Sequence, residues 1–353
     1  MIVGNSPISG KGNRLMTKPE PPLKLAHTIV RQIIQVICGT LMLLLIASPL
    51  PAVDLLNVTN LLYVTMDNTI VTFDTTSNDG AIIAASKSTF ISSNLNSPRG
   101  LAFDTSGNLY AANSGNNTIS KFNPAGNYLN SITSNLNGPY GLAFDSSGNL
   151  YAANRFESTI SKFNSAGVYQ RNIASNLEHP YGIAFDVLGN LYAANSGNST
   201  IDGFTISKFN PAGDFQSNIS SNPVAPILDP SSLAFDSSGN LYVANVVGCS
   251  ISKYSSAGIY QSIGSIRSVA PPIGLAFDSS GNLYATDAWN MNSISKYDSS
   301  GTFVMSWNVG EGGYPYSLAF KPVSVPEPST YALAIIATGV MLYLTRCRKA
   351  KLT

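Results

Sequence analysis

The sequence predicts an all-β fold made of six similar units, each with four short strands, and three observations carry this prediction. A unit of about 40 residues recurs along the chain, each copy contains four strand-like segments, and a segment missing before the first copy is found after the last. Repetition at such a period indicates an architecture in which each unit buries its apolar faces against its neighbours. The turn aspartate that marks the repeat occurs at Asp104, Asp145, Asp186, Asp236 and Asp278.

Each repeat reads as four strands of about five to seven residues. In the copy that begins at residue 98 these segments are GLAFD, NLYAAN, TISKF and YLNSITS. Between the first two segments, most copies have Asp-Ser-Ser-Gly, which has turn chemistry because the Asp side chain accepts hydrogen bonds from backbone amides and Gly adopts positive φ. Asn-Pro-Ala-Gly does the same between the last two, at residues 123–126 and 210–213. Four strands at this period are typical of the blades of a β-propeller.

The two ends of the repeat region complete one further blade. Residues 61–97 contain LLYVT, TIVTF and a weak fourth strand but lack a GLAFD-type strand, whereas residues 315–322 contain that strand alone. Pairing the two pieces would close the ring and leave no open sheet edge. We therefore predict a six-bladed propeller over residues 53–325. The five uninterrupted blades are expected at 98–138, 139–179, 180–229, 230–271 and 272–314.

The repeat P-x-G-L-A-F-D-S-S-G-N-L-Y-A-A-N resembles the NHL-type repeats of six-bladed propellers, over roughly residues 61–321. This resemblance implies the same fold. The family usually has Asp after Y-V-A and Arg five residues later, whereas this chain has neutral hydrogen-bonding residues at both positions. The substituted pairs are Asn113 with Thr118, Asn154 with Thr159, and Asn245 with Ser250.

Residues 1–52 are predicted to be a signal peptide. Lys18, Lys24 and Arg31 precede the apolar run 33–46, which is followed by the small-residue segment ASPLPA. This order of basic, apolar and small residues is that of a secretory signal processed by signal peptidase. The long basic region before the apolar run favours translation from Met16 as an alternative to Met1. A short apolar helix is expected at each end of the chain.

Residues 326–353 are predicted to be a second targeting signal. The motif V-P-E-P-S-T contains Pro326, Glu327 and Pro328, and is followed by the apolar segment 331–345 and a basic end. The basic end would stay cytoplasmic by the positive-inside bias. This arrangement resembles the PEP-CTERM sorting signal, which implies membrane attachment through 331–345 and then exosortase cleavage. It also implies export to the envelope, outer surface or extracellular matrix of a Gram-negative bacterium. The alternative is a plain membrane anchor, for which about 15 apolar residues are marginal.

The balance of charge opposes nucleic-acid binding. The whole chain has 20 Lys+Arg against 19 Asp+Glu, a formal net charge of +1. The two predicted targeting segments, 1–52 and 326–353, hold nine of the basic and two of the acidic residues. Residues 53–325 are left with 11 basic against 17 acidic residues, a formal net charge of −6. A nucleic-acid partner requires a dense basic face instead.

Cysteine and histidine are too scarce for a zinc site or a disulfide framework. Cys249 and His179 are the sole residues of their types between 53 and 325. We therefore expect no cofactor and no catalytic residue. The alternative is a divalent-cation-dependent lactonase or lyase, with Asp67 and Asp287 as ligands beside the amides of Asn113, Asn154 and Asn195. The five turn aspartates resemble half a calcium loop but lack the downstream acid, so Asx turns are expected there.

One face of the predicted ring is diversified. The turns between the first and second strands hardly vary, whereas the loops between the second and third differ from blade to blade. Aromatic rings and neutral amides on such loops suit sugars or extended peptides. The alternative is that the Tyr rings pack blade against blade. We expect a non-catalytic binding or structural module, whose partners are polysaccharide or surface proteins. The candidate ligand residues are Arg99, Tyr140, Arg155, Phe156, Glu157, Tyr181, Trp289 and Tyr316.

Overall fold

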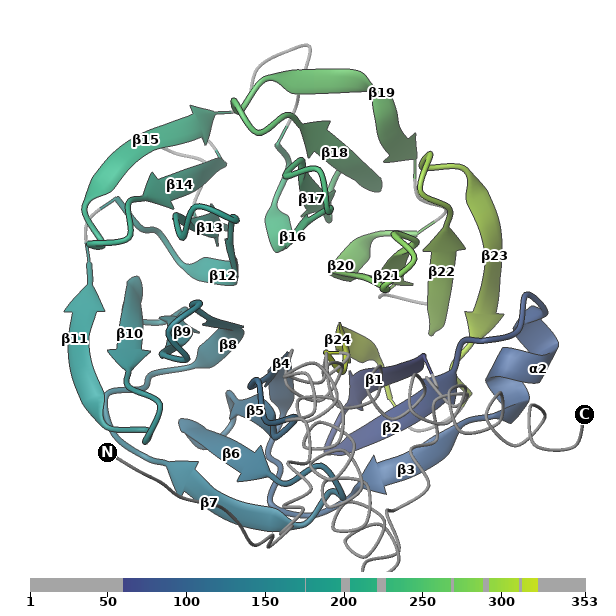
Figure 1. Cartoon of the computed structure of the whole chain (residues 1–353), viewed down its shortest axis with the longest axis horizontal. Coiled ribbons are helices and arrows are strands. Elements are labelled where there is room, and N and C mark those ends of the chain that lie inside the picture. Colours follow the sequence, from purple (N-terminus) through teal and green to yellow (C-terminus); the bar gives the residue numbers. More distant parts are fainter. Residues whose placement is uncertain are drawn as a thin grey trace, which may run out of the picture. The chain divides into compact units, whose positions relative to one another are not determined.

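The computed structural model describes residues 60–174, 176–197, 204–220, 227–267, 270–287, 292–310 and 313–322. Within these residues, six antiparallel sheets of four strands are arranged around a central axis (Figure 1). The predicted all-β, six-bladed propeller with four-stranded blades is therefore confirmed. The signal peptide 1–52, the sorting motif at 326–328, the segment 331–345 and the expected terminal helices lie outside the described residues. Within the described ranges, no helix has the length and apolar character needed to cross a membrane.

The blades are numbered here in chain order, each from its innermost strand outward. Blade 1 consists of β24 (Pro315–Phe320), β1 (Leu61–Met66), β2 (Thr69–Asp74) and β3 (Ser88–Ile91). Blade 2 consists of β4 (Pro98–Phe103), β5 (Leu109–Asn113), β6 (Thr118–Phe122) and β7 (Tyr128–Ile132). Blade 3 consists of β8 (Pro139–Phe144), β9 (Leu150–Asn154), β10 (Thr159–Phe163) and β11 (Tyr169–Ile173).

The remaining blades follow the same plan. Blade 4 consists of β12 (Pro180–Phe185), β13 (Leu191–Asn195), β14 (Thr205–Phe209) and β15 (Phe215–Ser220). Blade 5 consists of β16 (Pro230–Phe235), β17 (Leu241–Asn245), β18 (Ser250–Tyr254) and β19 (Tyr260–Arg267). Blade 6 consists of β20 (Pro272–Phe277), β21 (Leu283–Asp287), β22 (Ser293–Tyr297) and β23 (Phe303–Asn308).

Blade 1 is assembled from both ends of the described chain. β24 pairs antiparallel with β1, with Leu62 opposite Phe320 and Val64 opposite Leu318. The Ser317 amide also donates to Thr65 Oγ1 at 2.9 Å. The described propeller consequently begins and ends at the same face of the ring, the one that carries the Asp turns, because Phe320 occupies the position that precedes the turn in the other blades.

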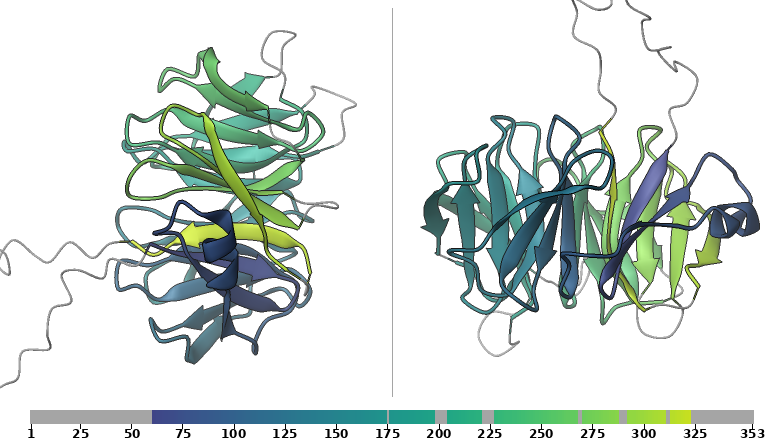
Figure 2. Two further views of the ribbon diagram at one scale, coloured as in Figure 1. Left: turned by 90° about the vertical axis from the view of Figure 1, so that its right-hand side faces the viewer. Right: turned by 90° about the horizontal axis from the view of Figure 1, so that it is seen from below.

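Blade 1 departs from the sequence prediction in one respect. The weak fourth strand is present as β3, but a short helix that was not predicted, α2 (Gly80–Ala85), comes before it. The Asp79 carboxylate caps this helix by accepting from the amides of Ala81 and Ile82. Ile83 is fully buried in a cluster with Phe73 and Trp307, and α2 lies beside β23 at the outer edge of the ring (Figures 1 and 2).

The core lies between the sheets. The second strand of each of blades 2 to 6 is buried at every position, because both of its faces pack on neighbouring sheets. A tyrosine on this strand meets a phenylalanine on the innermost strand of the next blade edge to face, a geometry that adds about 0.5–1.5 kcal/mol per pair. The ring centroids are 4.9–5.1 Å apart in the pairs Tyr63–Phe103, Tyr110–Phe144, Tyr151–Phe185, Tyr192–Phe235, Tyr242–Phe277 and Tyr284–Phe320.

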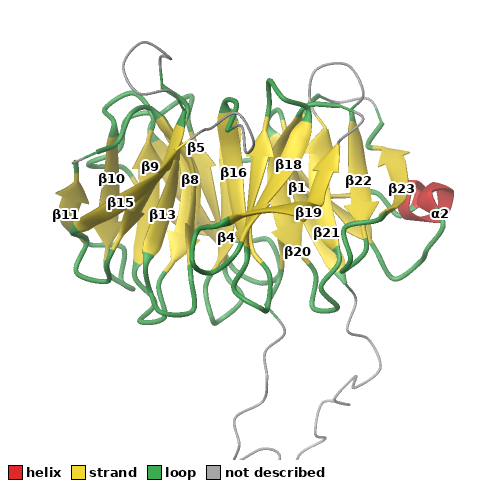
Figure 3. Cartoon of the chain, turned by 90° about the horizontal axis from the view of Figure 1, so that it is seen from above, coloured by secondary structure: helices red, strands yellow, loops and turns green. Residues whose placement is uncertain are grey.

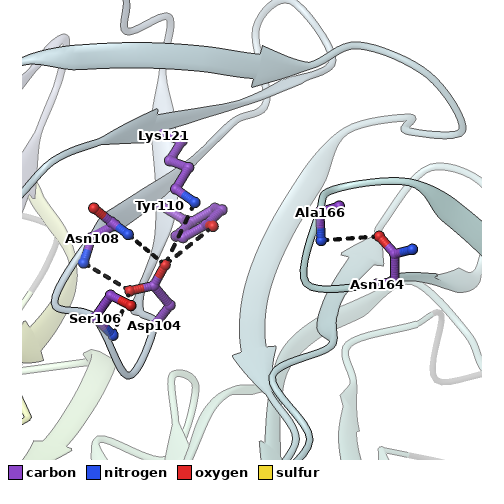
Figure 4. A network of polar contacts seen from close by, with 7 residues as sticks. All are labelled: Asp104, Ser106, Asn108, Tyr110, Lys121, Asn164 and Ala166. Atoms are coloured by element: carbon purple, nitrogen blue, oxygen red, sulfur yellow. Dashed lines mark hydrogen bonds and ion pairs between the residues drawn. The ribbon is translucent and has the colours of Figure 1, made fainter.

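The turn after each innermost strand of blades 2 to 6 is organised by its aspartate. One oxygen of Asp104 accepts from the amides of Ser106 and Asn108, at 3.0 and 2.9 Å (Figure 4). The other accepts from the Asn108 side chain and the Tyr110 hydroxyl, and lies 3.6 Å from Lys121 Nζ. These contacts make an Asx turn in which the carboxylate oxygens are occupied by protein donors. Asp145, Asp186, Asp236 and Asp278 accept from the corresponding amides in their own blades.

The turn at Asp145 is expected to make stability depend on acid pH. Burial raises the pKa of this carboxyl, but hydrogen bonds from Asn149 and the charge of Lys162 outweigh burial, and the pKa is lowered. A carboxyl with a lowered folded-state pKa stabilises the protein above its unfolded pKa, and this contribution is lost as pH falls through the folded value. Asp145→Asn should therefore be less stable than wild type at pH 7, with the difference shrinking as pH falls below the ordinary pKa of an aspartate carboxyl. Urea midpoints measured from pH 7 to pH 2.5 test this.

The chain offers an uncharged control. Asn164 organises the turn between β10 and β11 by accepting from the amides of Ala166 and Val168, and Figure 4 shows the contact with Ala166. Asn164→Ala should lower the urea midpoint by a similar amount at every pH, because no proton is bound. A difference for Asp145→Asn that stayed constant down to pH 2.5 would contradict the assignment.

Candidate functional site

The innermost strands line a central channel. Each begins with proline, and the residue after that proline lines the channel mouth. Figure 3 shows the two rims of the ring, each formed by loops that join neighbouring strands. A cavity of about 270 Å³ lies at this mouth, and a narrower one of about 100 Å³ continues between the six strands. The residues that follow the six prolines are Arg99, Tyr140, Tyr181, Ser231, Ile273 and Tyr316.

Two arginines lie among tyrosine rings in the channel mouth. Arg99 Cζ is 3.7 Å from the ring centroid of Tyr316 and 5.6 Å from that of Tyr140. Arg155, from the loop after β9, has its Cζ 5.2 Å from Tyr140 and 5.3 Å from Tyr181. Cation–π contacts of this kind stabilise a guanidinium against an aromatic face. Tyr140 and Tyr181 themselves meet edge to face, at 4.6 Å between centroids.

Neither arginine is paired with a carboxylate of the described residues. Within the described ranges the ion pairs join lysines to turn aspartates, and neither Arg99 nor Arg155 belongs to one. The Nε atoms of both arginines are buried and, among the same residues, have no hydrogen-bond acceptor. A buried charged donor without an acceptor is costly and calls for an explanation.

Asp229 brings a single negative charge to the same cavity. It precedes Pro230, has a φ of +53°, and accepts a hydrogen bond from the Ser196 hydroxyl. Burial, reinforced by Tyr140, raises the pKa of Tyr181 to about 12, although Arg99 and Arg155 act in the opposite direction. Tyr181 is therefore a neutral phenol at physiological pH and can donate a hydrogen bond.

The structure brings together most of the candidate ligand residues. Arg99, Tyr140, Arg155, Tyr181 and Tyr316 line the 270 Å³ cavity. Phe156 is 57% exposed and lies 6.3 Å from Tyr140 between ring centroids, at the rim. Glu157 is outside the cavity lining and accepts from the Asn137 side chain at 3.2 Å. Trp289 lies outside the described residues.

Sequence reasoning missed Asp229 and Ser196 as lining residues. The position before each blade-opening proline is variable, being Ser97, Gly138, His179 and Asp229 in blades 2 to 5, and all four have positive φ. Positive φ is uncommon for residues other than glycine, and here it marks the bend into the innermost strand. A comparison of the repeats at this position, as well as after the proline, would have identified Asp229 as a candidate lining residue.

Part of the diversified face connects blade to blade. Asn68 and Asn117 accept from the amides of Ser97 and Gly138, and Ser158 accepts from that of His179. Each acceptor belongs to the loop between the second and third strands of one blade, and each amide to the bend that opens the next. These loops therefore fix the spacing of blades 1 to 4.

The asparagines considered as metal ligands are engaged within their own blades. Asn154 is fully buried, accepts from the Asn137 amide at 3.2 Å, and donates to Thr159 and Ser161. Asn113 and Asn195 make the corresponding contacts, and Asp287 accepts from Ser293 and Ser295. In the described part of the chain, no group of three or more His, Cys, Asp or Glu residues could hold a metal ion.

Comparison with known proteins supports the fold. The NHL repeat family matches residues 95–122, which confirms the predicted repeat for that segment. No curated protein matches the sequence. A chain from the crystal structure of the nidogen/laminin complex has 20% identity and a TM-score of 0.66, covering 75% of this chain and 98% of that one.

Two lyases are also structurally similar. Virginiamycin B lyase from Staphylococcus aureus has 14% identity and a TM-score of 0.54, with 75% of this chain and 93% of that chain covered. A streptogramin B lyase has 15% identity and a TM-score of 0.50, with 71% and 74% covered. Identities this low show the fold alone, since one propeller fold serves many functions. The chain is thus a six-bladed β-propeller of four-stranded blades that carries an NHL repeat.

Proposed function

We propose that this protein is an exported, non-catalytic binding module of the cell surface or extracellular matrix, which binds polysaccharide at the channel mouth. The observation that carries the proposal is the gathering of Arg99, Arg155 and three tyrosines around one cavity. Aromatic walls with a few convergent polar groups are typical of ligand sites.

The placement of the two faces supports this role. The described propeller begins and ends at the Asp-turn face, whereas the cavity opens on the opposite face. The PEP-CTERM-like segment 326–353 follows soon after residue 322. A tether leaving from the turn face would point the channel mouth away from the membrane, toward other molecules of the surface or matrix.

Exchange of Phe156 for serine tests the proposal at the rim. Phe156 is exposed and contacts Tyr140, so its loss should remove ligand contact without opening the core. We expect the full-length protein to bind polysaccharide extracted from the producing cells, and Phe156→Ser to weaken binding about fivefold, or about 1 kcal/mol. Isothermal titration with sized polysaccharide fragments measures this.

Tyr128→Ser is the matched control. Tyr128 is 44% exposed on β7, the outermost strand of blade 2, and its ring lies outside the cavity lining. This change should leave the affinity unaltered. Equal losses for the two variants, or no binding by wild type, would overturn the proposal.

The second candidate is a divalent-cation-dependent lactonase or lyase, which the likeness to two lyases brings into consideration. Metal analysis of the purified protein and thermal unfolding with and without chelator distinguish the two. If the protein is a binding module, we expect metal analysis to find no stoichiometric metal and the chelator to leave the melting temperature unchanged. A bound metal whose removal lowers the melting temperature would favour the enzyme.

A further inference from the structure

Among the described residues, the channel mouth has an excess of positive charge that no ion pair compensates. Arg99, Arg155 and Asp229 line one cavity, which gives this small volume a formal charge of +1, although residues 53–325 together carry −6. Asp229 accepts from Ser196, and no ion pair joins it to either arginine among the described residues. The local charge therefore complements one negative group. A polyanion would be repelled by the negative charge of the surrounding protein.

The way the arginines are held identifies the kind of negative group. The Arg99 guanidinium lies over the Tyr316 ring and near that of Tyr140, and the N–H donors of a guanidinium lie in its plane. Arg155 is held in the same manner by Tyr140 and Tyr181. Two planar guanidinium groups held among aromatic rings match the two oxygens of a carboxylate, which arginine binds in bidentate fashion.

The rest of the cavity indicates what carries the carboxylate. Its volume of about 270 Å³ is slightly below the range of about 300–1,000 Å³ typical of sites for drug-sized ligands, so it suits one compact ring. Asp229 has a second oxygen that can accept from a ligand hydroxyl, and Tyr181 remains protonated and can donate to one. A ring that bears both hydroxyls and a carboxylate is a uronic acid.

We propose that the channel mouth binds a single uronic-acid residue, with its carboxylate held by Arg99 and Arg155 and its hydroxyls facing Asp229 and Tyr181. This assignment rests on the proposed polysaccharide-binding function and names the sugar class that the site recognises. A terminal or isolated uronate meets the requirement for one charge, whereas a run of uronates would be disfavoured by the acidic body of the propeller.

The experiment uses the full-length protein and small probes. Galacturonate and glucuronate should bind in isothermal titration, and glucose, which lacks the carboxylate, should bind at least tenfold more weakly. Arg99→Met and Arg155→Met should each weaken uronate binding at least tenfold, since each removes a charge-assisted hydrogen-bond donor. Arg99→Lys keeps the charge but loses the planar fork, so its affinity should fall between those of Arg99→Met and wild type.

Arg171→Met is the control for loss of charge. Arg171 is exposed on β11, the outermost strand of blade 3, where it donates to the carbonyl oxygen of Ala212. This variant should bind uronate as wild type does. The melting temperature of each variant reports whether its fold is intact. Competition between uronate and intact polysaccharide is measured on wild type, so it does not depend on the stability of any variant.

The outcomes separate this inference from the function on which it rests. Polysaccharide binding that uronate does not compete with would overturn the uronate assignment and leave the binding module standing. Binding of a peptide carboxylate, tested with acetyl-alanyl-alanine, in preference to uronate would overturn the sugar class. Absence of binding to both polysaccharide and uronate would overturn both proposals.

Discussion

Gly100→Ala is expected to lower the free energy of unfolding by about 3 kcal/mol, because the inner ring of strands has no room for a methyl group at this position. A Cβ on Gly100 would lie 2.0 Å from the carbonyl oxygen of Tyr140, on the innermost strand of the next blade. Backbone atoms cannot rotate away as a side chain can, so blades 2 and 3 would have to separate. Denaturant unfolding followed by tryptophan fluorescence measures the change.

Ser232→Ala provides the comparison. Ser232 occupies the position equivalent to Gly100 in blade 5, where its Oγ accepts from the Leu275 amide of blade 6 at 3.1 Å. A Cβ is already accommodated there, so the substitution removes one hydrogen bond and should cost about 1 kcal/mol. If Gly100→Ala proved no more destabilising than Ser232→Ala, close contact between blades 2 and 3 would not be the reason for glycine.

Asn154→Leu is expected to lower the free energy of unfolding by about 3–4 kcal/mol, because it removes three hydrogen bonds of a fully buried side chain. The Asn137 amide would lose its acceptor, and the hydroxyls of Thr159 and Ser161 would lose their donor. Leucine has a similar volume, so the loss would arise from unsatisfied polar groups more than from a cavity. Urea unfolding monitored by circular dichroism tests this prediction.

Two further variants define the origin of that loss. Asn130→Leu places the same side chain at an exposed position of β7, where the change should stay within about 0.5 kcal/mol. Asn154→Asp reproduces the residue found at the equivalent position of blade 6, where Asp287 accepts from two serine hydroxyls. It should be less destabilising than leucine, because a carboxylate can still accept from the Asn137 amide. Equal losses for aspartate and leucine would contradict this account.

Local chemistry made much of the fold readable from the sequence. The Asp turns, the glycines at positive φ and the strand lengths depend on contacts between residues close in sequence, such as the hydrogen bond from the Asn108 amide to the Asp104 carboxylate. Period and turn chemistry therefore predicted six blades of four strands. Helix α2 was missed because its formation depends on the Asp79 cap together with burial of Ile83 against Trp307, which comes from blade 6.

The candidate site was predicted in part. Tyr140, Tyr181 and Tyr316 follow blade-opening prolines, so their repeat position alone indicated a shared face. Arg155 belongs to a different loop, and its position over Tyr140 and Tyr181 depends on how that loop folds back toward the axis. Asp229 was overlooked because it precedes the proline instead of following it. Glu157 shared the predicted face but bonds to Asn137 at the rim.

Repeat number, blade composition and the identity of the variable face follow from the order of residues, because each depends on a pattern that recurs every 41 residues or so. The charge of the channel mouth and the residues that line it do not follow from the order of residues. Arg99, Arg155 and Asp229 come from three separate blades, and closure of the ring alone brings them around one cavity. The net charge of −6 for residues 53–325 can be counted from the sequence, whereas only the closed ring places together two arginines that form no ion pair with the described residues.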